Sequence, residues 1–224
     1  CTIEESEDGT PQIVCGDDAP IALPTKQDCS LKGDYHLNTD RDLLIFLATG
    51  CTEISGKLII MDSELTALHG LENLQFIGEH LLVYSNDHLS DLSGLENLRA
   101  IGGDFEILKN GSLTDFQGLE SLERIEGARI ISNNNLVNFR GLERLETVGG
   151  DTPYFNARIF EIYDNNSLVD LTGLDSLRSI AGDAIFAANE NLISLNGLEN
   201  LETIGNSLDV FSNNLKDFKT LESL

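Results

Sequence analysis

A glycine–leucine dipeptide recurs along most of the chain at a nearly constant spacing. Successive copies lie 24, 24, 23, 32 and 24 residues apart, and an altered copy follows 23 residues later. The copies are Gly70-Leu71, Gly94-Leu95, Gly118-Leu119, Gly141-Leu142, Gly173-Leu174 and Gly197-Leu198, and the altered one is Thr220-Leu221. The long step contains an insertion at residues 151–158. A fixed period of this length is typical of repeat architectures, in which neighbouring repeats bury each other.

Each repeat has three parts. The dipeptide opens a Gly-Leu-acid-x-Leu-x-x-Ile stretch, a segment of alternating character such as residues 81–84 or 105–108 follows, and an Asn-rich corner then leads to Leu-x-x-Leu or Leu-x-x-Phe. Alternation over four to six residues indicates a short, half-buried strand, and no repeat has room for a ten-residue helix as well. We therefore predict an all-β fold, a right-handed parallel β-helix of about seven coils of 23–24 residues.

Stacked coils would align the repeated apolar residues into columns that no single coil can bury. The first column holds Leu71, Leu95, Leu119, Leu142, Leu174 and Leu198, the second Leu74, Leu98, Leu122, Leu145, Leu177 and Leu201, and the third Ile77, Ile101, Ile125, Val148, Ile180 and Ile204. The corner asparagines are Asn86, Asn110, Asn133, Asn165 and Asn189. We expect their amides to bond backbone groups that the turn leaves unpaired.

The two ends of the repeat array differ. Residues 40–47 form an amphipathic pattern with Thr39 or Asp40 as the N-cap and Gly50 beyond the end, which predicts a short helix covering the first coil. At the other end the sequence stops within a repeat at Leu224, without a polar cap. We expect an open strand edge there, covered by a second copy or by a further domain.

The four cysteines, Cys1, Cys15, Cys29 and Cys51, all lie in the first quarter of the chain. Three pairings are open, and the local one, Cys1 with Cys15 and Cys29 with Cys51, is favoured because strand formers flank a turn between the first two. We expect a disulfide hairpin and linker over residues 1–28 and the solenoid over 29–224. Disulfides would place the protein in an oxidising compartment. Four free thiols in a cytosolic protein are the alternative.

The charge excludes some classes of function. Lys plus Arg number 14 against 38 Asp plus Glu, and the net charge is −24, which argues against nucleic-acid partners and against docking on anionic lipid. No apolar run is long enough to span a membrane. No phosphate loop, nucleophile elbow, zinc-protease motif or dinucleotide fingerprint occurs, so neither an enzyme nor a cofactor is expected. Because the chain starts at Cys1 and not at Met, we expect a preceding segment such as an export signal.

The pattern resembles the receptor L-domain family, the leucine-rich β-helices of growth-factor receptor ectodomains, with relatives in fungal cell-wall and exported bacterial proteins. Residues 50–60 after the capping helix, the Leu-x-x-Leu-x-Gly-Leu-Glu-x-Leu-x-x-Ile-Gly unit and the placement of Cys29 relative to Cys51 carry the resemblance, which covers residues 29–224. It implies extracellular binding or scaffolding and no catalysis. Leucine-rich repeat proteins outside this family share Leu-x-Val-x-x-Asn-x-x-Leu at residues 81–89 and are the alternative fold.

Alternate strand residues point outward, and they give the best candidate for a binding surface, because exposed apolar patches usually mark contacts. In register the first outward column holds Met61, Tyr84, Leu108, Ile131, Tyr163, Ala187 and Phe211. The second holds Ile59, Leu82, Glu106, Arg129, Glu161, Ile185 and Asp209. Tyr154 and Phe155 in the insertion are further candidates. Scattered surface residues and a variable loop are the structural alternatives.

Two other patterns carry weaker functional hypotheses. The repeats place one acidic residue per coil, at Glu72, Glu96, Glu120, Glu143, Asp175, Glu199 and Glu222. One carboxylate per coil is a poor cage for Ca²⁺, so we expect a solvated acidic face and no metal site. Asn110-Gly111-Ser112 and Asn165-Asn166-Ser167 match the N-glycosylation pattern, at a corner where Asn has a structural role.

Taken together, these features predict a non-enzymatic, exported or cell-surface module that binds a protein or glycan through the outward strand face. A structural spacer or envelope component without a specific ligand is the second hypothesis. A polysaccharide-acting enzyme on a β-helix is the third, and His80 and His88 are expected to be surface histidines, not catalytic ones.

Overall fold

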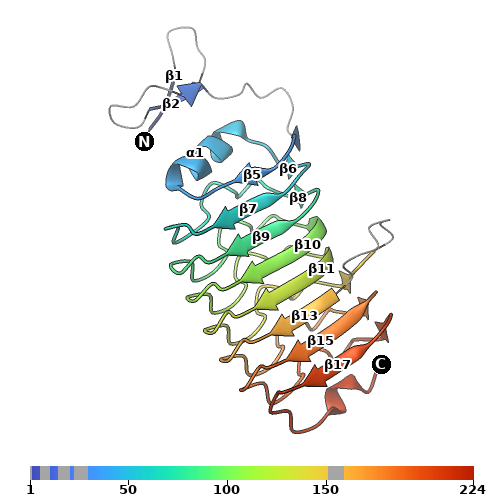
Figure 1. Ribbon diagram of the computed structural model, residues 1–224. Coiled ribbons are helices and arrows are strands. Elements are labelled where there is room, and N and C mark those ends of the chain that lie inside the picture. Colours follow the sequence, from blue (N-terminus) through green and yellow to red (C-terminus); the bar gives the residue numbers. More distant parts are fainter. Residues whose placement is uncertain (1, 6–10, 15–20, 23–29, 151–158) are drawn as a thin grey trace.

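The computed structural model describes residues 2–5, 11–14, 21–22, 30–150 and 159–224, and most of these build a parallel β-solenoid of about seven coils (Figure 1). Each coil contributes one strand to a first sheet and a shorter strand to a second, and every described pair in these sheets is parallel. The prediction of a stacked all-β solenoid is confirmed.

The first sheet is the stack of arrows in Figure 1, and its outward side is called the strand face below. Its strands are β5 (Tyr35–His36), β7 (Leu58–Met61), β9 (Leu81–Tyr84), β10 (Ala100–Leu108), β11 (Arg124–Ile131), β13 (Ile159–Tyr163), β15 (Asp183–Ala187) and β17 (Leu208–Phe211). The register carries each repeat residue onto its counterpart in the next coil, as in Met61 beside Tyr84 and Tyr84 beside Leu108. Equivalent side chains therefore stack one strand spacing apart.

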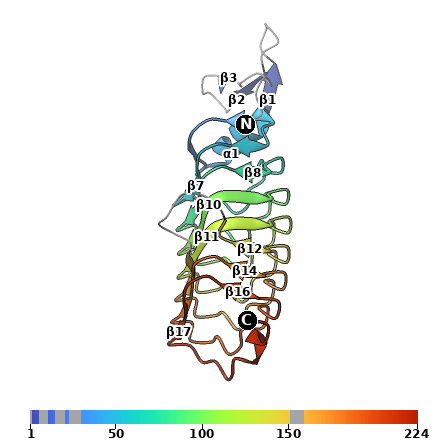
Figure 2. The same ribbon diagram turned by 90° about the vertical axis from the view of Figure 1, so that its right-hand side faces the viewer.

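The second sheet runs beside the first (Figure 2). Its short strands are β4 (Ser30–Leu31), β6 (Glu53–Ile54), β8 (Phe76–Ile77), β12 (Thr147–Val148), β14 (Ser179–Ile180) and β16 (Thr203–Ile204). β10 and β11 are long enough to belong to both sheets, and their pairing shifts register between Ile101 and Asp104, where the chain turns from one sheet into the other.

A helix closes the first coil. α1 (Asp40–Thr49) begins after Thr39, whose hydroxyl accepts from Asp42 N, while the Asp42 carboxylate accepts from the Thr39 N–H. It ends at Gly50, which has a left-handed conformation. Leu43 and Phe46 bury their side chains, and the predicted capping helix is confirmed with two more residues at its C-terminal end. Burial raises the pKa of Tyr35, which packs edge-on against Phe46, and the nearby Cys51 adds to the rise.

Four further elements of the described residues lie outside the stack. β1 (Thr2–Glu5) pairs antiparallel with β2 (Pro11–Val14), and β2 pairs antiparallel with β3 (Ile21–Ala22). A short 3₁₀ helix, η1 (Lys219–Leu221), follows the last strand. Cys1, Cys15 and Cys29 lie outside the described residues, so their pairing stays a prediction; Cys51 is buried.

The core consists of columns of aliphatic side chains that run along the stack of coils. The three predicted columns are buried throughout, except that Ile204 in the last coil is partly exposed. Phenylalanines also pack in the core. The ring centroid of Phe116 lies 5.8 Å from that of Phe105 and 5.2 Å from that of Phe139. Because each coil buries its leucines against the next, stability comes from the interfaces between coils.

The corner asparagines form a continuous buried ladder. Asn133 shows the pattern: its Nδ2 donates to Ile107 O at 2.8 Å and to Ile131 O at 3.2 Å, while its Oδ1 accepts from the Asn110 N–H at 2.9 Å. Each Nδ2 also donates to the Oδ1 of the next ladder residue at 3.1–3.4 Å, so every amide joins three coils. The expected bonding of backbone groups is confirmed. Two members were not predicted: Ser63 donates to Asn86 at the start of the ladder, and Asn213 accepts from Asn189 at its end.

The residue before each ladder position has a left-handed backbone. None of these seven residues is glycine: they are Asp62, Ser85, Lys109, Ser132, Asp164, Ala188 and Ser212, with φ between 49° and 57°. Such a conformation is unfavourable for residues with a Cβ. The buried amide bonds hold the corner in this shape, because giving it up would leave several buried polar groups unpaired.

The acidic column has a structural role. In six coils the carboxylate accepts a hydrogen bond from the N–H of the glycine two residues earlier, at 2.8–3.1 Å, as Glu120 does from Gly118. Each acid therefore closes its own turn. The regular spacing of negative charge follows from this local bond and needs no cation to explain it.

The glycine of the repeated dipeptide cannot carry a side chain. Gly118 has φ +101°, and a Cβ placed there would overlap Leu92 O of the preceding coil. We expect Gly118→Ala to lower the free energy of unfolding by about 3 kcal/mol or more, measured by denaturant titration, because strain and overlap add. Gly33→Ala is the matched control, since Gly33 has φ +92° with nothing within 4 Å of the added atom. Equal losses in the two variants would contradict close coil stacking.

The asparagine ladder gives a second prediction. Asn133→Ala removes the donor to two buried carbonyls and the acceptor for the Asn110 N–H, so we expect a loss of roughly 3 kcal/mol or more in a thermal or denaturant melt. The neighbouring exposed Asn134, changed to Ala, should lose less than about 1 kcal/mol. Equal stability of the Asn133→Ala and Asn134→Ala variants would contradict an energetic role of the ladder.

Candidate functional site

The first outward column forms a line of apolar side chains on the strand face. Met61, Tyr84, Leu108 and Ile131 are half-buried by their neighbours, whereas Tyr163 and Phe211 are 40% and 54% exposed. The backbone register joins all of them through β7, β9, β10, β11, β13, β15 and β17. These six residues are called the apolar stripe below.

Ala187 differs from the other members of its column. It pairs in register between Tyr163 and Phe211, but its exposed fraction is 0%. A methyl group on a strand is short, so the larger groups around it cover it. The expectation that Ala187 contributes to the surface is wrong, because alternation gives the direction of a side chain and not its reach.

A cation flanks one aromatic member of the stripe. Lys109 follows Leu108 at the left-handed corner, and its Nζ lies 5.6 Å from the centroid of the Tyr84 ring. That distance is within the range of a cation–π contact. The ring of Tyr84 is thereby held in place.

The second outward column is charged in its centre and apolar at both sides. Arg129 lies between Glu106 and Glu161, with Nη1 at 3.7 Å from one carboxylate and Nε at 3.8 Å from the other. Ile59 and Leu82 precede this group in register, and Ile185 and Asp209 follow it. The group carries a net charge of −1 and sits beside the stripe, where it can select among partners by charge.

The histidines of the surface are engaged with neighbouring groups. The Asp104 N–H donates to His80 Nδ1 at 3.0 Å, and the Asp104 carboxylate lies 3.5 Å from the same nitrogen. His88 Nε2 lies 3.2 Å from the Glu64 carboxylate. In the described part of the chain, no group of three or more His, Cys, Asp or Glu side chains is placed to hold a metal ion. Tyr154 and Phe155 lie outside the described residues.

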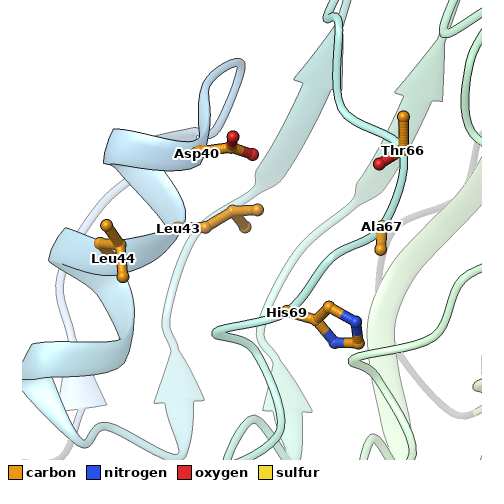
Figure 3. A pocket seen from close by; sticks show the side chains of 6 residues that line it. All are labelled: Asp40, Leu43, Leu44, Thr66, Ala67 and His69. Carbon is orange, nitrogen blue, oxygen red and sulfur yellow. The ribbon is translucent and has the colours of Figure 1, made fainter. Parts of the chain in front are cut away.

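A pocket of about 260 Å³ lies between α1 and the turn after β7 (Figure 3). Its lining is Asp40, Leu43, Leu44, Thr66, Ala67 and His69. Burial pushes the pKa of the adjoining Asp91 up, but hydrogen bonds from Ser93 and Ser90 and the proximity of His69 outweigh burial and leave that pKa below its ordinary value. No pattern in the sequence predicts this pocket, since it lies where the first repeat meets the helix and no repeated residue marks it.

The two glycosylation motifs fall on ladder residues. Asn110 and Asn165 are both 0% exposed, and each Nδ2 donates to main-chain carbonyls of its own coil and of a preceding coil. A glycan on either nitrogen would replace one of these bonds and place a sugar inside the solenoid. The folded chain therefore has no acceptor nitrogen accessible at these motifs.

Comparisons with known proteins agree with this architecture. A family model described as Receptor L domain matches residues 50–114 and 100–197 of the chain. A search of curated proteins found no match. Among the described helices, none has the length and apolar character needed to cross a membrane.

We predict that the folded protein, secreted from a glycosylating host, carries no glycan at Asn110 or Asn165. Intact mass before and after glycosidase treatment measures this directly. Gln75→Ser creates a motif on exposed Asn73 and should be glycosylated, which shows that the host pathway reaches the chain. A glycan found on Asn110 or Asn165 of folded protein would refute the ladder as described.

Proposed function

This chain belongs to the receptor L-domain family, and we propose that it is a non-enzymatic binding module that recognises a protein or a glycan through its strand face. The family is one of ligand-binding domains found in receptor ectodomains. The family is also typically extracellular, and we propose an exported location for this protein, at the cell surface, in the extracellular space or in the periplasm. The ligand is the part that the family does not supply.

The apolar stripe is the observation that carries the proposal. Six apolar side chains lie along a single face, and four of them are aromatic or sulfur-containing: Met61, Tyr84, Tyr163 and Phe211. Water on such a face would be released when a partner covers it. Aromatic residues are enriched at the centres of protein interfaces and also stack on sugars, which is why both partner classes fit.

The sheet offers this surface in a nearly rigid form. The strand backbones are paired to neighbours on both sides from β7 to β15, and the asparagine ladder fixes the corner after each strand. A preorganised surface loses little conformational entropy on binding, so a modest apolar area can suffice. The charged group around Arg129 would then set the orientation of the partner.

The proposal divides the chain into a disulfide hairpin and linker over residues 1–28 and the solenoid over 29–224. β16 and β17 each pair with one neighbour in the structure, β14 and β15 respectively. A further strand, from this chain or another copy, could pair with them and extend the strand face.

The proposal is tested by measuring which probes the stripe binds. The purified chain is screened against an array of glycans and a panel of secreted proteins, and each binder is titrated by calorimetry against the double variant Tyr163→Ala/Phe211→Ala. We expect the affinity to fall at least tenfold, about 1.4 kcal/mol, as is typical when exposed aromatic anchors are removed from an interface.

The control is a second pair of exposed apolar residues outside the strand face. Val137 and Val169 are 42% and 38% exposed on the turns of adjacent coils, where Val169 N donates to Val137 O. Val137→Ala/Val169→Ala should leave the affinity within about twofold. Binders that depend on these valines and not on the stripe, or a chain that binds none of the probes, would favour the structural spacer.

A further inference from the structure

The junction between α1 and the first coil has one of the two main-chain contacts found between successive coils and lacks the other. In each later junction a main-chain carbonyl of the preceding coil packs against the repeat glycine, as Leu68 O does against Gly94. At the first junction Leu43 O of the helix takes this place, 2.7 Å from where a Cβ on Gly70 would lie. Leu43 is therefore the helical counterpart of Leu68.

The helix cannot supply the hydrogen bond that goes with this contact. Between coils the residue that packs its carbonyl also donates its N–H forward: Leu68 N donates to Ser93 O at 3.0 Å, and Leu92 N donates to Gln117 O at 2.8 Å. The N–H of Leu43 is already used inside the helix, where it donates to Thr39 O at 3.2 Å. His69 O, the counterpart of Ser93 O, is left without a donor among the described residues.

This carbonyl belongs to a residue that lines the pocket of Figure 3. The pocket has an apolar part formed by Leu43, Leu44 and Ala67. Its polar side chains are those of Asp40, Thr66 and His69, and the Asp40 carboxylate, like His69 O, has no hydrogen-bond or ion-pair partner in the described part of the chain. The imidazole of His69 instead lies 3.6 Å from Glu72.

We propose that this pocket receives an arginine or lysine side chain of a partner polypeptide. The apolar stem of such a side chain would pack against Leu44 and Ala67. Its cationic head would donate hydrogen bonds to the Asp40 carboxylate and the His69 carbonyl. A neutral side chain such as glutamine supplies donors but no charge for Asp40, and an anionic side chain would be repelled by it. The site lies at the capped end of the solenoid, so it is separate from the strand face and does not depend on the function proposed for that face.

The local field supports a cation. The N-terminus of α1 contributes about half a positive charge, which opposes binding, but Asp40 and Asp42 in the first turn outweigh it. Asp42 is committed to the capping bonds, so Asp40 is the carboxylate available to a ligand. Glu72 and the ionised Asp91 add negative charge near the same turn.

The test is a titration followed by NMR, with Nα-acetyl-arginine-methylamide as the probe and Nα-acetyl-citrulline-methylamide as its neutral isostere. We expect saturable shifts of the Leu44, Ala67 and His69 amides with the arginine probe, in the millimolar range. The citrulline probe should bind at least about fivefold more weakly than the arginine probe. The reason is that charge-assisted hydrogen bonds are roughly twice as strong as neutral ones.

Three variants separate the site from general attraction to an acidic protein. Asp40→Asn should weaken the arginine probe about three- to tenfold, and Ala67→Leu, which fills the pocket, should abolish its shifts. Asp62→Asn removes an exposed carboxylate elsewhere and should change the affinity less than about twofold. Asp40→Asn keeps the Thr39–Asp42 capping box, and a melting curve checks that it folds.

Four results would overturn the proposal. These are the absence of saturable shifts at the pocket, equal binding of the citrulline probe, equal weakening by Asp40→Asn and Asp62→Asn, and shifts of the same amides by inorganic phosphate instead of the cation. Each separates a built cation site from diffuse electrostatic attraction or from an anion site at the helix N-terminus.

Discussion

The asparagine ladder is the interaction on which the geometry of this molecule depends. A buried amide has two donor hydrogens and two acceptor lone pairs, and at Asn110, Asn133, Asn165 and Asn189 they are met by the coils on both sides. Because an unmet buried amide is unfavourable by about 1–3 kcal/mol per group, a coil cannot slip or rotate without breaking bonds in two neighbours. The leucine columns supply most of the hydrophobic driving force, but leucine contacts are non-directional and tolerate small shifts.

Rigid corners have a consequence for the surface. Each left-handed residue before a ladder position ends a strand of the first sheet, so the strands all stop at the same level. Equivalent side chains then lie one strand spacing apart, and the apolar stripe results. A surface of this kind is set by the repeat, and under the proposed function its specificity would come from the residues that depart from the repeat, such as Arg129 between two glutamates.

Departures from the repeat also define the capped end. α1 reproduces the packing of a preceding coil through the Leu43 carbonyl but keeps its N–H groups for its own helix. The helix thus covers the apolar end of the solenoid and leaves the His69 carbonyl without a donor from the residues that the structure describes. A repeat protein is most uniform in its middle and least repetitive at its ends, and the pocket between α1 and the turn after β7 lies at such an end.

The amino-acid sequence by itself determined the stacked architecture, the inward columns, the capping helix and the outward order from Met61 to Phe211, because period and alternation decide which residues face one another. It also predicted that the corner asparagines bond the backbone. Only the tertiary structure decided that Ala187 is covered, that Glu120 and its counterparts close their own turns, that Asn110 and Asn165 are inaccessible to a glycan, and that a pocket lies beside His69. The reason is that reach, burial and the supply of hydrogen-bond donors depend on groups about one coil away in sequence, and no local pattern encodes which of those groups are already in use.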